Sequence, residues 1–200
     1  MSEKQSYFTI DRKSSAEFRD RGSKFIAYAY PIEFVEDFKK ILQQLKKDNP
    51  KAAHHCFAYR LGVDENNWRV SDDGEPSGTA GRPILGQIDS KQLTNVLVVV
   101  VRYFGGTLLG VPGLINAYKT AASMALQLTA IVQKKVMIKH QIQFNYTHLN
   151  EVMQLLKSHN CEVNLREMQL FCHVVVLIPR EREAEVLEML KEIQGVEVIQ

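Results

Sequence analysis

The stretch VLVVVVRYFGGTLLGVPGLINAYKTAA, from Val96 to Ala122, decides the fold of the first half of this chain. Its six leading residues are apolar and mostly β-branched, and the run is too short for a helix, which predicts a strand buried on both faces. Four glycines follow, at positions 105, 106, 110 and 113, and helical spacing begins at Leu114. The stretch therefore predicts a buried strand, a glycine-rich turn and a long helix that extends to residue 128 or 130.

The glycine-rich turn has two interpretations. Backbone N–H groups without a neighbouring Cβ can approach a ligand closely, and the next helix offers its positive end, so Gly105 and Gly106 are candidates for holding an anion. The segment GGTLLGVPG, however, has neither the spacing of a dinucleotide-binding turn nor that of a P-loop. The alternative is that the glycines only allow tight turns and close packing of strand against helix.

Length and composition indicate two modules. The chain has 200 residues, of which 45% are hydrophobic and 24% charged, so two domains of about 100 residues each are expected. The opening residues lack the apolar segment of a signal peptide and no apolar run approaches about 18 residues, so we expect a cytoplasmic protein without a membrane span. Three widely spaced cysteines indicate neither disulfides nor zinc, and we expect Cys56, Cys161 and Cys172 to be small buried side chains.

The charge distribution argues against one class of function. Residues 1–132 carry 17 lysines and arginines against 14 acidic residues, and residues 133–200 carry 8 against 9. Neither part is the strongly basic body of a protein dedicated to binding duplex nucleic acid. Local basic patches stay compatible with these totals.

Hydrophobic periodicity predicts the other elements of the first module. Strands are expected at residues 7–10, 24–32, 54–60 and 68–70, an amphipathic helix at 33–48, and a second helix from Ser77 or Thr79 to Ile88.

Two adjacent histidines, His54 and His55, open the strand at 54–60. Adjacent residues on a strand point to opposite faces, so the two cannot easily share one ion, and we expect no metal site. Either histidine is a candidate for ligand binding or proton transfer, because histidine titrates near neutral pH.

An acidic loop, SDDGEPSGTAGRP at residues 71–83, follows the strand at 68–70. Asp72, Asp73 and Glu75 can hold a magnesium ion or act as a base, or they can cap the helix that follows. Capping accounts for one or two acids, so we interpret the segment as a functional loop, with no cofactor and no metal assigned to it.

The second module has a different pattern. Strands are expected at residues 136–146, 161–168, 170–178 and 196–199, and helices at 149–159 and 179–193. The order β-α-β-β-α-β is that of a ferredoxin-like domain, in which two helices back one sheet. We place the boundary between residues 132 and 133.

Three motifs carry a resemblance to a known family: AAHHCFAYRLG at residues 52–62, SDDGEPSGTAGRPIL at 71–85 and VVVVRYFGGTLLGVPGLINAY at 98–118. With them the chain resembles the IMPACT family, in particular its two-domain bacterial YigZ-type members, over about residues 18–126. The resemblance implies an α+β protein. Its first domain, residues 1–132, would have the fold of ribosomal protein S5 domain 2, and its ferredoxin-like second domain, residues 133–200, would resemble the C-terminal domain of elongation factor G.

The resemblance also implies a field of function. Such folds recur in ribosome-associated and RNA-associated proteins, and a nucleic-acid or ribosome-linked role has been proposed for the bacterial members. The eukaryotic member acts in translational control by competing for the activator of a starvation-sensing kinase. That role depends on an additional N-terminal domain that this sequence does not contain, so we do not expect it here.

Three functions are ranked. The first is binding of RNA, the ribosome or a translation factor, with arginine and lysine as phosphate partners and Tyr103 and Phe104 as stacking surfaces, unless these two pack in the core. A protein-binding adaptor comes next. An enzyme on a small anionic ligand, with a histidine and a carboxylate as acid and base, comes last. The candidate ligand-binding residues are His54, His55, Asp72, Asp73, Glu75, Arg82, Arg102, Gly105, Gly106 and Lys119. For RNA, Arg60 is a further candidate phosphate partner.

Overall fold

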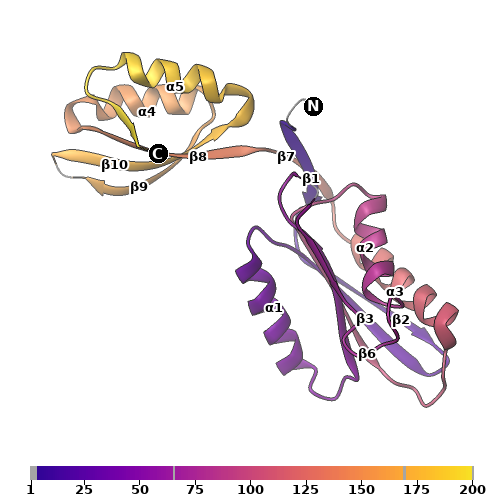
Figure 1. Ribbon diagram of the computed structural model, residues 1–200. Coiled ribbons are helices and arrows are strands. Elements are labelled where there is room, and N and C mark those ends of the chain that lie inside the picture. The colour runs from indigo at the N-terminus through magenta and orange to yellow at the C-terminus, as the bar shows by residue number, and fades with distance from the viewer. Residues whose placement is uncertain (1–3, 65, 169, 200) are drawn as a thin grey trace. The chain divides into compact units, whose positions relative to one another are not determined.

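The computed structural model describes residues 4–64, 66–168 and 170–199, and the contacts within the chain divide it into two compact units (Figure 1). The first unit is Tyr7–Lys134, and the second combines Met1–Ser6 with Lys135–Gln200. Two hydrogen bonds attach the start of the chain to the second unit. The Gln5 carbonyl accepts from the Val136 N–H at 2.9 Å, and the Lys4 carbonyl accepts from the Arg180 guanidinium at 3.3 Å.

The first unit contains a five-stranded antiparallel sheet with the strand order β2-β3-β6-β4-β5. A separate two-stranded sheet pairs β1 with β7. The predicted buried strand is β6, at the centre of the larger sheet. The strand bounds are β1 (Ser6–Ile10), β2 (Ser14–Asp20), β3 (Ser23–Pro31), β4 (His54–Arg60), β5 (Trp68–Ser71), β6 (Val96–Tyr103) and β7 (Ile131–Lys135).

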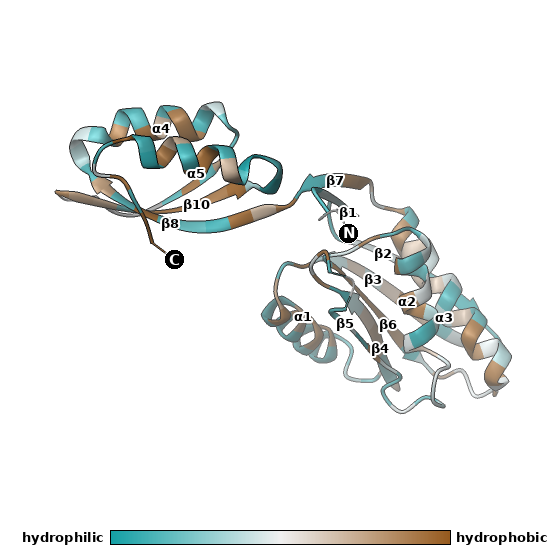
Figure 2. Cartoon of the chain, turned by 45° about the horizontal axis from the view of Figure 1, so that its top comes forward, coloured by the Kyte–Doolittle hydropathy of each residue, from teal (hydrophilic) through white to brown (hydrophobic). Residues whose placement is uncertain are grey.

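Helices cover both faces of this sheet, which is consistent with the unbroken apolar run from Val96 to Val101 in β6 (Figure 2). One side of the strand, represented by Val98 and Val100, packs with α2 (Gly81–Ser90) and α3 (Gly110–Gln127). The opposite side, represented by Val99 and Val101, packs with α1 (Val35–Asp48). All four side chains are fully buried, and each such valine contributes about 1.5 to 3 kcal/mol to folding.

Two helices of the first unit begin at other residues than expected, and strand β2 was missed. The long helix begins at Gly110 instead of Leu114, because Pro112 is tolerated in the first turn of a helix. The short helix begins at Gly81, later than Ser77 or Thr79. Strand β2 was not predicted, because its sequence SSAEFRD is polar on one side: only Ala16 and Phe18 pack against the core.

The second unit has the predicted order β-α-β-β-α-β, and its antiparallel sheet has the strand order β11-β8-β10-β9. Both helices lie on one face of the sheet (Figure 1). Pro179 was expected to open a helix, but it ends β10 instead. A short 3-10 turn follows it and precedes α5. The bounds are β8 (Met137–Asn145), η1 (Tyr146–His148), α4 (Leu149–Ser158), β9 (Glu162–Met168), β10 (Phe171–Pro179), η2 (Arg180–Arg182), α5 (Glu183–Glu192) and β11 (Glu197–Ile199).

Two properties of the described residues bear on the expectations above. Cys56 and Cys172 are buried as expected, but Cys161 is only half-buried, because it lies at the edge of the second unit's core. Among the helices of the described ranges, none combines the length and the hydropathy that crossing a bilayer requires.

Candidate functional site

The register of the central sheet brings a histidine and an arginine together at one end of β6. His54 of β4 is directly opposite Arg102 of β6, so their side chains leave the sheet on the same face. Both belong to the side that packs under α3. Arg102 is only 5% exposed at this position. Its guanidinium requires a partner, because a buried unpaired charge is strongly unfavourable.

Glu75 of the acidic loop is that partner. Its Oε1 atom accepts a hydrogen bond from Arg102 Nη1 at 2.6 Å and another from the Tyr118 hydroxyl at 2.7 Å. The Arg102 and Glu75 side chains are 6% and 3% exposed. Buried ion pairs are maintained by additional hydrogen bonds, and Arg102 Nη2 donates one to Ser23 Oγ at 3.5 Å.

Cys56 extends this group towards the acidic loop. Its thiol lies 3.0 Å from the Asp72 carbonyl and 3.4 Å from the Tyr118 hydroxyl, and can donate to either. Burial raises the pKa of the Cys56 thiol and of the Tyr118 hydroxyl far above their ordinary values. Cys56 therefore stays a thiol near neutral pH and is not an activated nucleophile. We refer to His54, Cys56, Glu75, Arg102 and Tyr118 as the polar cluster.

His54 is the most accessible member of the polar cluster, with a side chain that is 24% exposed. Its Nδ1 lies 2.8 Å from the backbone carbonyl of Asp73. A carbonyl can only accept, so Nδ1 carries the hydrogen, and in neutral His54 the Nε2 atom has a free lone pair. Nε2 lies 3.9 Å from Glu75 Oε1, too far for a direct hydrogen bond. In neutral His54 the Nε2 lone pair is thus available to accept a hydrogen bond.

The first acid of the loop is a helix cap. The Asp72 carboxylate accepts from the N–H groups of Gly78, Ala80 and Gly81 at 2.8 to 3.0 Å. Burial opposes the ionisation of Asp72, but these backbone hydrogen bonds outweigh it and lower the pKa of Asp72. This is the capping role that the sequence offered as one alternative for the acidic loop.

Asp73, the second acid of the loop, contacts residues on the α1 side of the sheet. Asp73 Oδ2 accepts from the backbone N–H of His55 at 2.7 Å, and Asp73 Oδ1 lies 3.5 Å from Lys46 Nζ of α1. His55 itself is 8% exposed and faces α1. Burial lowers the pKa of His55, against the opposing effect of the Asp73 charge. The two histidines therefore point to different sides, and the described residues contain no group of three or more metal-binding side chains.

The glycine turn is held at its base by backbone contact. A Cβ atom on Gly105 would lie 1.9 Å from the carbonyl carbon of Gly22, so only glycine fits there. The Gly105 N–H donates to Ser23 Oγ at 3.2 Å, and Ser23 also accepts from Arg102. Through Arg102 and Glu75, the base of the glycine turn and the acidic loop are joined in one network.

Other candidate residues lie elsewhere. The Arg60 guanidinium, at the far end of β4, pairs with Asp89 at 2.5 Å, and the Arg82 guanidinium lies 4.7 Å from the centre of the Trp68 ring. Lys119 is exposed on α3, and Gly106 is exposed with a φ of +85°, which favours glycine.

The two aromatic residues after β6 differ. Tyr103 lies on the α1 side of the sheet, where its hydroxyl donates to Asn49 Oδ1 at 2.7 Å. Phe104 is 52% exposed and its ring centre lies 5.6 Å from the Arg102 guanidinium. Phe104 is therefore not a core residue.

Sequence reasoning missed three residues of this network: Ser23, Cys56 and Tyr118. Cys56 and Tyr118 lie in apolar segments, where core packing is the ordinary role, and Ser23 lies beside Gly22 in a predicted turn. No local signal distinguishes them, since their side-chain partners within the network are between 43 and 82 residues away, and the nearest backbone partner, the Asp72 carbonyl beside Cys56, is 16 residues away.

Comparison with known proteins gives consistent matches. The family model of the Impact N-terminal domain matches residues 21–126. An IMPACT family member of Haemophilus influenzae is 34% identical over 94% of both chains, and the IMPACT family member YigZ of Escherichia coli is 33% identical over 82% of this chain and 81% of that protein. A crystal structure of a hypothetical protein superposes with a TM-score of 0.77, at 29% identity, over 98% of this chain and 97% of the other.

Proposed function

This chain belongs to the IMPACT family and is close to YigZ and YvyE over most of its length, and we propose that it is a non-enzymatic binding protein that acts in translation or its regulation. The link to translation comes from the family resemblance, whose folds recur in ribosome-associated and RNA-associated proteins. The partner classes that follow from the family resemblance are RNA, the ribosome and translation factors.

One observation carries the proposal: an exposed apolar surface at the glycine turn and the start of α3. Phe104 is 52% exposed, Leu108 82%, Val111 51% and Ile115 39%. Contiguous apolar side chains on the surface of a protein are typical of interaction sites. We call these four residues the turn surface.

The polar cluster supports this role because it holds the turn in place. Arg102, whose charge is neutralised by Glu75, lies next to Phe104, and Gly105 is in backbone contact with Gly22. A contact surface that is fixed before binding loses less conformational entropy when a partner binds.

The geometry favours a protein partner over RNA. Arg60, Arg82 and Arg102 each have an internal partner, so they are poorly placed as phosphate ligands. The exposed cation Lys119 follows Ile115 by one helical turn, which adds one charge to an apolar surface. Apolar centres with few charges are typical of protein–protein contacts, whereas RNA-binding surfaces carry many cations.

The fold assignments implied by the family are part of the proposal. We assign the first domain, residues 1–132, to the ribosomal protein S5 domain 2-like fold and the second, residues 133–200, to the ferredoxin-like fold of the C-terminal domain of elongation factor G. The antiparallel sheet between helices in the first unit, and the strand order of the second, support this assignment.

Cosedimentation of the full chain with ribosomes and with purified translation factors tests the proposal. The variant Leu108→Asp should lose binding, and Leu128→Asp, which changes a leucine that is 62% exposed at the other end of α3, should keep it. Equal binding by both variants would contradict the proposed surface. Fluorescence anisotropy with labelled RNA distinguishes an RNA partner from a protein partner. If RNA is the partner, the labelled RNA should bind, and its binding should weaken as the salt concentration increases.

A second candidate, an enzyme on a small anionic ligand, rests on His54, whose side chain is 24% exposed and whose Nε2 lies 3.9 Å from Glu75 Oε1. Phosphorylated and carboxylate metabolites would then raise the melting temperature of the protein. His54→Gln should abolish that increase. If none of them changes the melting temperature of the unmodified protein, this candidate is contradicted.

A further inference from the structure

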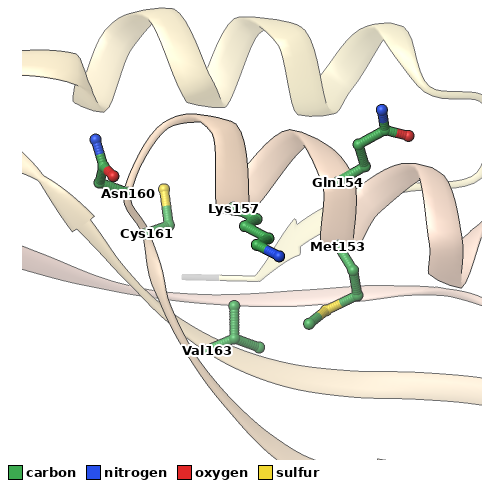
Figure 3. A pocket seen from close by; sticks show the side chains of 6 residues that line it. All are labelled: Met153, Gln154, Lys157, Asn160, Cys161 and Val163. Atoms are coloured by element: carbon green, nitrogen blue, oxygen red, sulfur yellow. The ribbon is translucent and has the colours of Figure 1, made fainter.

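The second unit contains a pocket that none of the functions above uses. It has a volume of about 750 Å³, within the range of pockets that bind small ligands, and lies between α4 and β9 (Figure 3). The lining residues are Met153, Gln154, Lys157, Asn160, Cys161 and Val163.

The pocket adjoins a free sheet edge. Strand β9 is the last strand in the order β11-β8-β10-β9, and within the described parts of the chain only β10 pairs with it. The other edge of β9 therefore presents unpaired backbone N–H and C=O groups. Such an edge can accept an added strand, which gains main-chain hydrogen bonds while neighbouring pockets receive its side chains.

The side chains of the pocket define what such a strand must carry. Met153 extends from α4 towards the sheet, and Val163 rises from β9 below it, which gives an apolar floor and wall (Figure 3). The Lys157 ammonium lies between these two side chains in the same view, and no ion pair or hydrogen bond of this group is found among the described residues. An apolar side chain and a carboxylate are complementary to this lining.

We propose that the second unit binds a peptide segment in extended conformation, paired along the free edge of β9, with a carboxylate side chain at Lys157 and an apolar side chain against Met153 and Val163. Side chains two positions apart point to the same face of a strand, so the acidic and the apolar residue of the ligand are separated by one residue. This inference is independent of the function proposed for the first unit.

A defined probe tests the proposal with the full chain. It is a fluorescein-labelled peptide with threonine at alternate positions and valine, aspartate and valine between them, which places the last three on one face. Fluorescence anisotropy should show saturable binding, and amide hydrogen exchange should show new protection of β9.

Two control peptides test the two parts of the proposal. One has asparagine in place of aspartate. The other is methylated on the backbone nitrogens of alternate residues and cannot pair as a strand. The first should bind about fivefold more weakly, as expected for loss of one exposed charge pair, and the second should not bind.

Variants of the protein give the matched comparison. Lys157→Met should weaken binding of the aspartate peptide about fivefold and leave the asparagine peptide unaffected. Lys157→Arg should retain most of the affinity. Lys191→Met, which removes an exposed lysine from α5 in the same unit, should bind like the unmodified protein. Thermal unfolding of all three variants verifies that the fold is kept.

Several results would overturn the proposal. They are absence of probe binding, equal binding of the methylated peptide, and equal weakening by Lys157→Met and Lys191→Met. Protection of β9 amides that depends only on protein concentration would show that a second copy of the chain covers the edge instead. A small carboxylate that binds as tightly as the peptide would show that main-chain pairing is not needed.

Discussion

Arg102 and Glu75, which are 27 residues apart in the chain, form an ion pair of 2.6 Å that is almost completely withdrawn from solvent. The pair joins the end of the central strand to the acidic loop, and Tyr118 connects the same carboxylate to α3. One carboxylate oxygen therefore connects the acidic loop, the end of β6 and α3.

Removal of the Glu75 carboxylate should strongly destabilise the protein. Glu75→Ala leaves the Arg102 charge buried without its partner, and losses of about 3 to 5 kcal/mol in the free energy of unfolding are expected for such a change. Urea denaturation measures it. Glu17→Ala is the matched control, because Glu17 pairs with Arg19 on the surface, where the side chains are 42% and 73% exposed, and such pairs contribute at most about 1 kcal/mol.

Replacement of both partners by apolar residues gives a sharper test of the same pair. The double variant Glu75→Leu with Arg102→Met contains no buried charge, so it should be more stable than Glu75→Ala alone. If the double variant is the less stable of the two, the hydrogen bonds of the pair to Tyr118 and Ser23 contribute more to stability than the unpaired Arg102 charge removes.

A methyl group at Gly105 should destabilise the base of the glycine turn. The backbone of Gly22 lies where the Cβ atom would be, so Gly105→Ala requires the two turns to separate. Gly86→Ala should have the opposite effect, because Gly86 lies in α2 with open space around it, and alanine in a helix is favoured over glycine by about 1 kcal/mol. Thermal unfolding of the two variants compares them, and equal melting temperatures would contradict the close contact.

The contribution of Asp72 should depend on pH. Its pKa is lower in the folded protein than in the unfolded chain, so its stabilisation is complete above the unfolded value of about 3.9 and is lost as the pH falls through the folded pKa. At pH 7, Asp72→Ala should lower the free energy of unfolding by about 1 to 2 kcal/mol, as for other helix caps. Urea denaturation at pH 7 and at pH 3 should show a smaller difference at pH 3. A difference that stays constant would mean that the carboxylate charge is not involved.

His55 should make the protein less stable under mildly acidic conditions. Its folded pKa lies below that of an unperturbed histidine, so the unfolded chain binds the proton first and stability decreases as the pH falls below about 6.5. The groups that face His55 are Asp73, Lys46 and Asn49. His55→Phe should reduce this decrease between pH 7 and pH 5, as measured by chemical denaturation. His148→Gln, at an exposed histidine pair with Glu151 before α4, should retain it.

The strongest local patterns were sufficient to predict most of the elements. The valines of β6 are β-branched and have no polar position, which fits only a strand covered on both faces, and the structure has it at the centre of the sheet. The second unit follows its predicted order because each segment alternates or repeats with one clear period. Strand β2 escaped prediction because Phe18 and Ala16 are its only inward apolar side chains.

The sequence by itself determined where most of the strands and helices form and which of their faces are apolar, because those properties depend on residues close by in the chain. It also offered helix capping as one alternative for the acids of the acidic loop, and Asp72 takes that role across nine residues. Only the tertiary structure decided that Glu75 meets Arg102 and Tyr118, that His54 and His55 serve opposite faces, and that Phe104 stays exposed beside a buried guanidinium. Those relationships follow from the register of β4 against β6 and from the contact of two glycine turns, and residues distant in sequence carry no local pattern that reveals such a pairing.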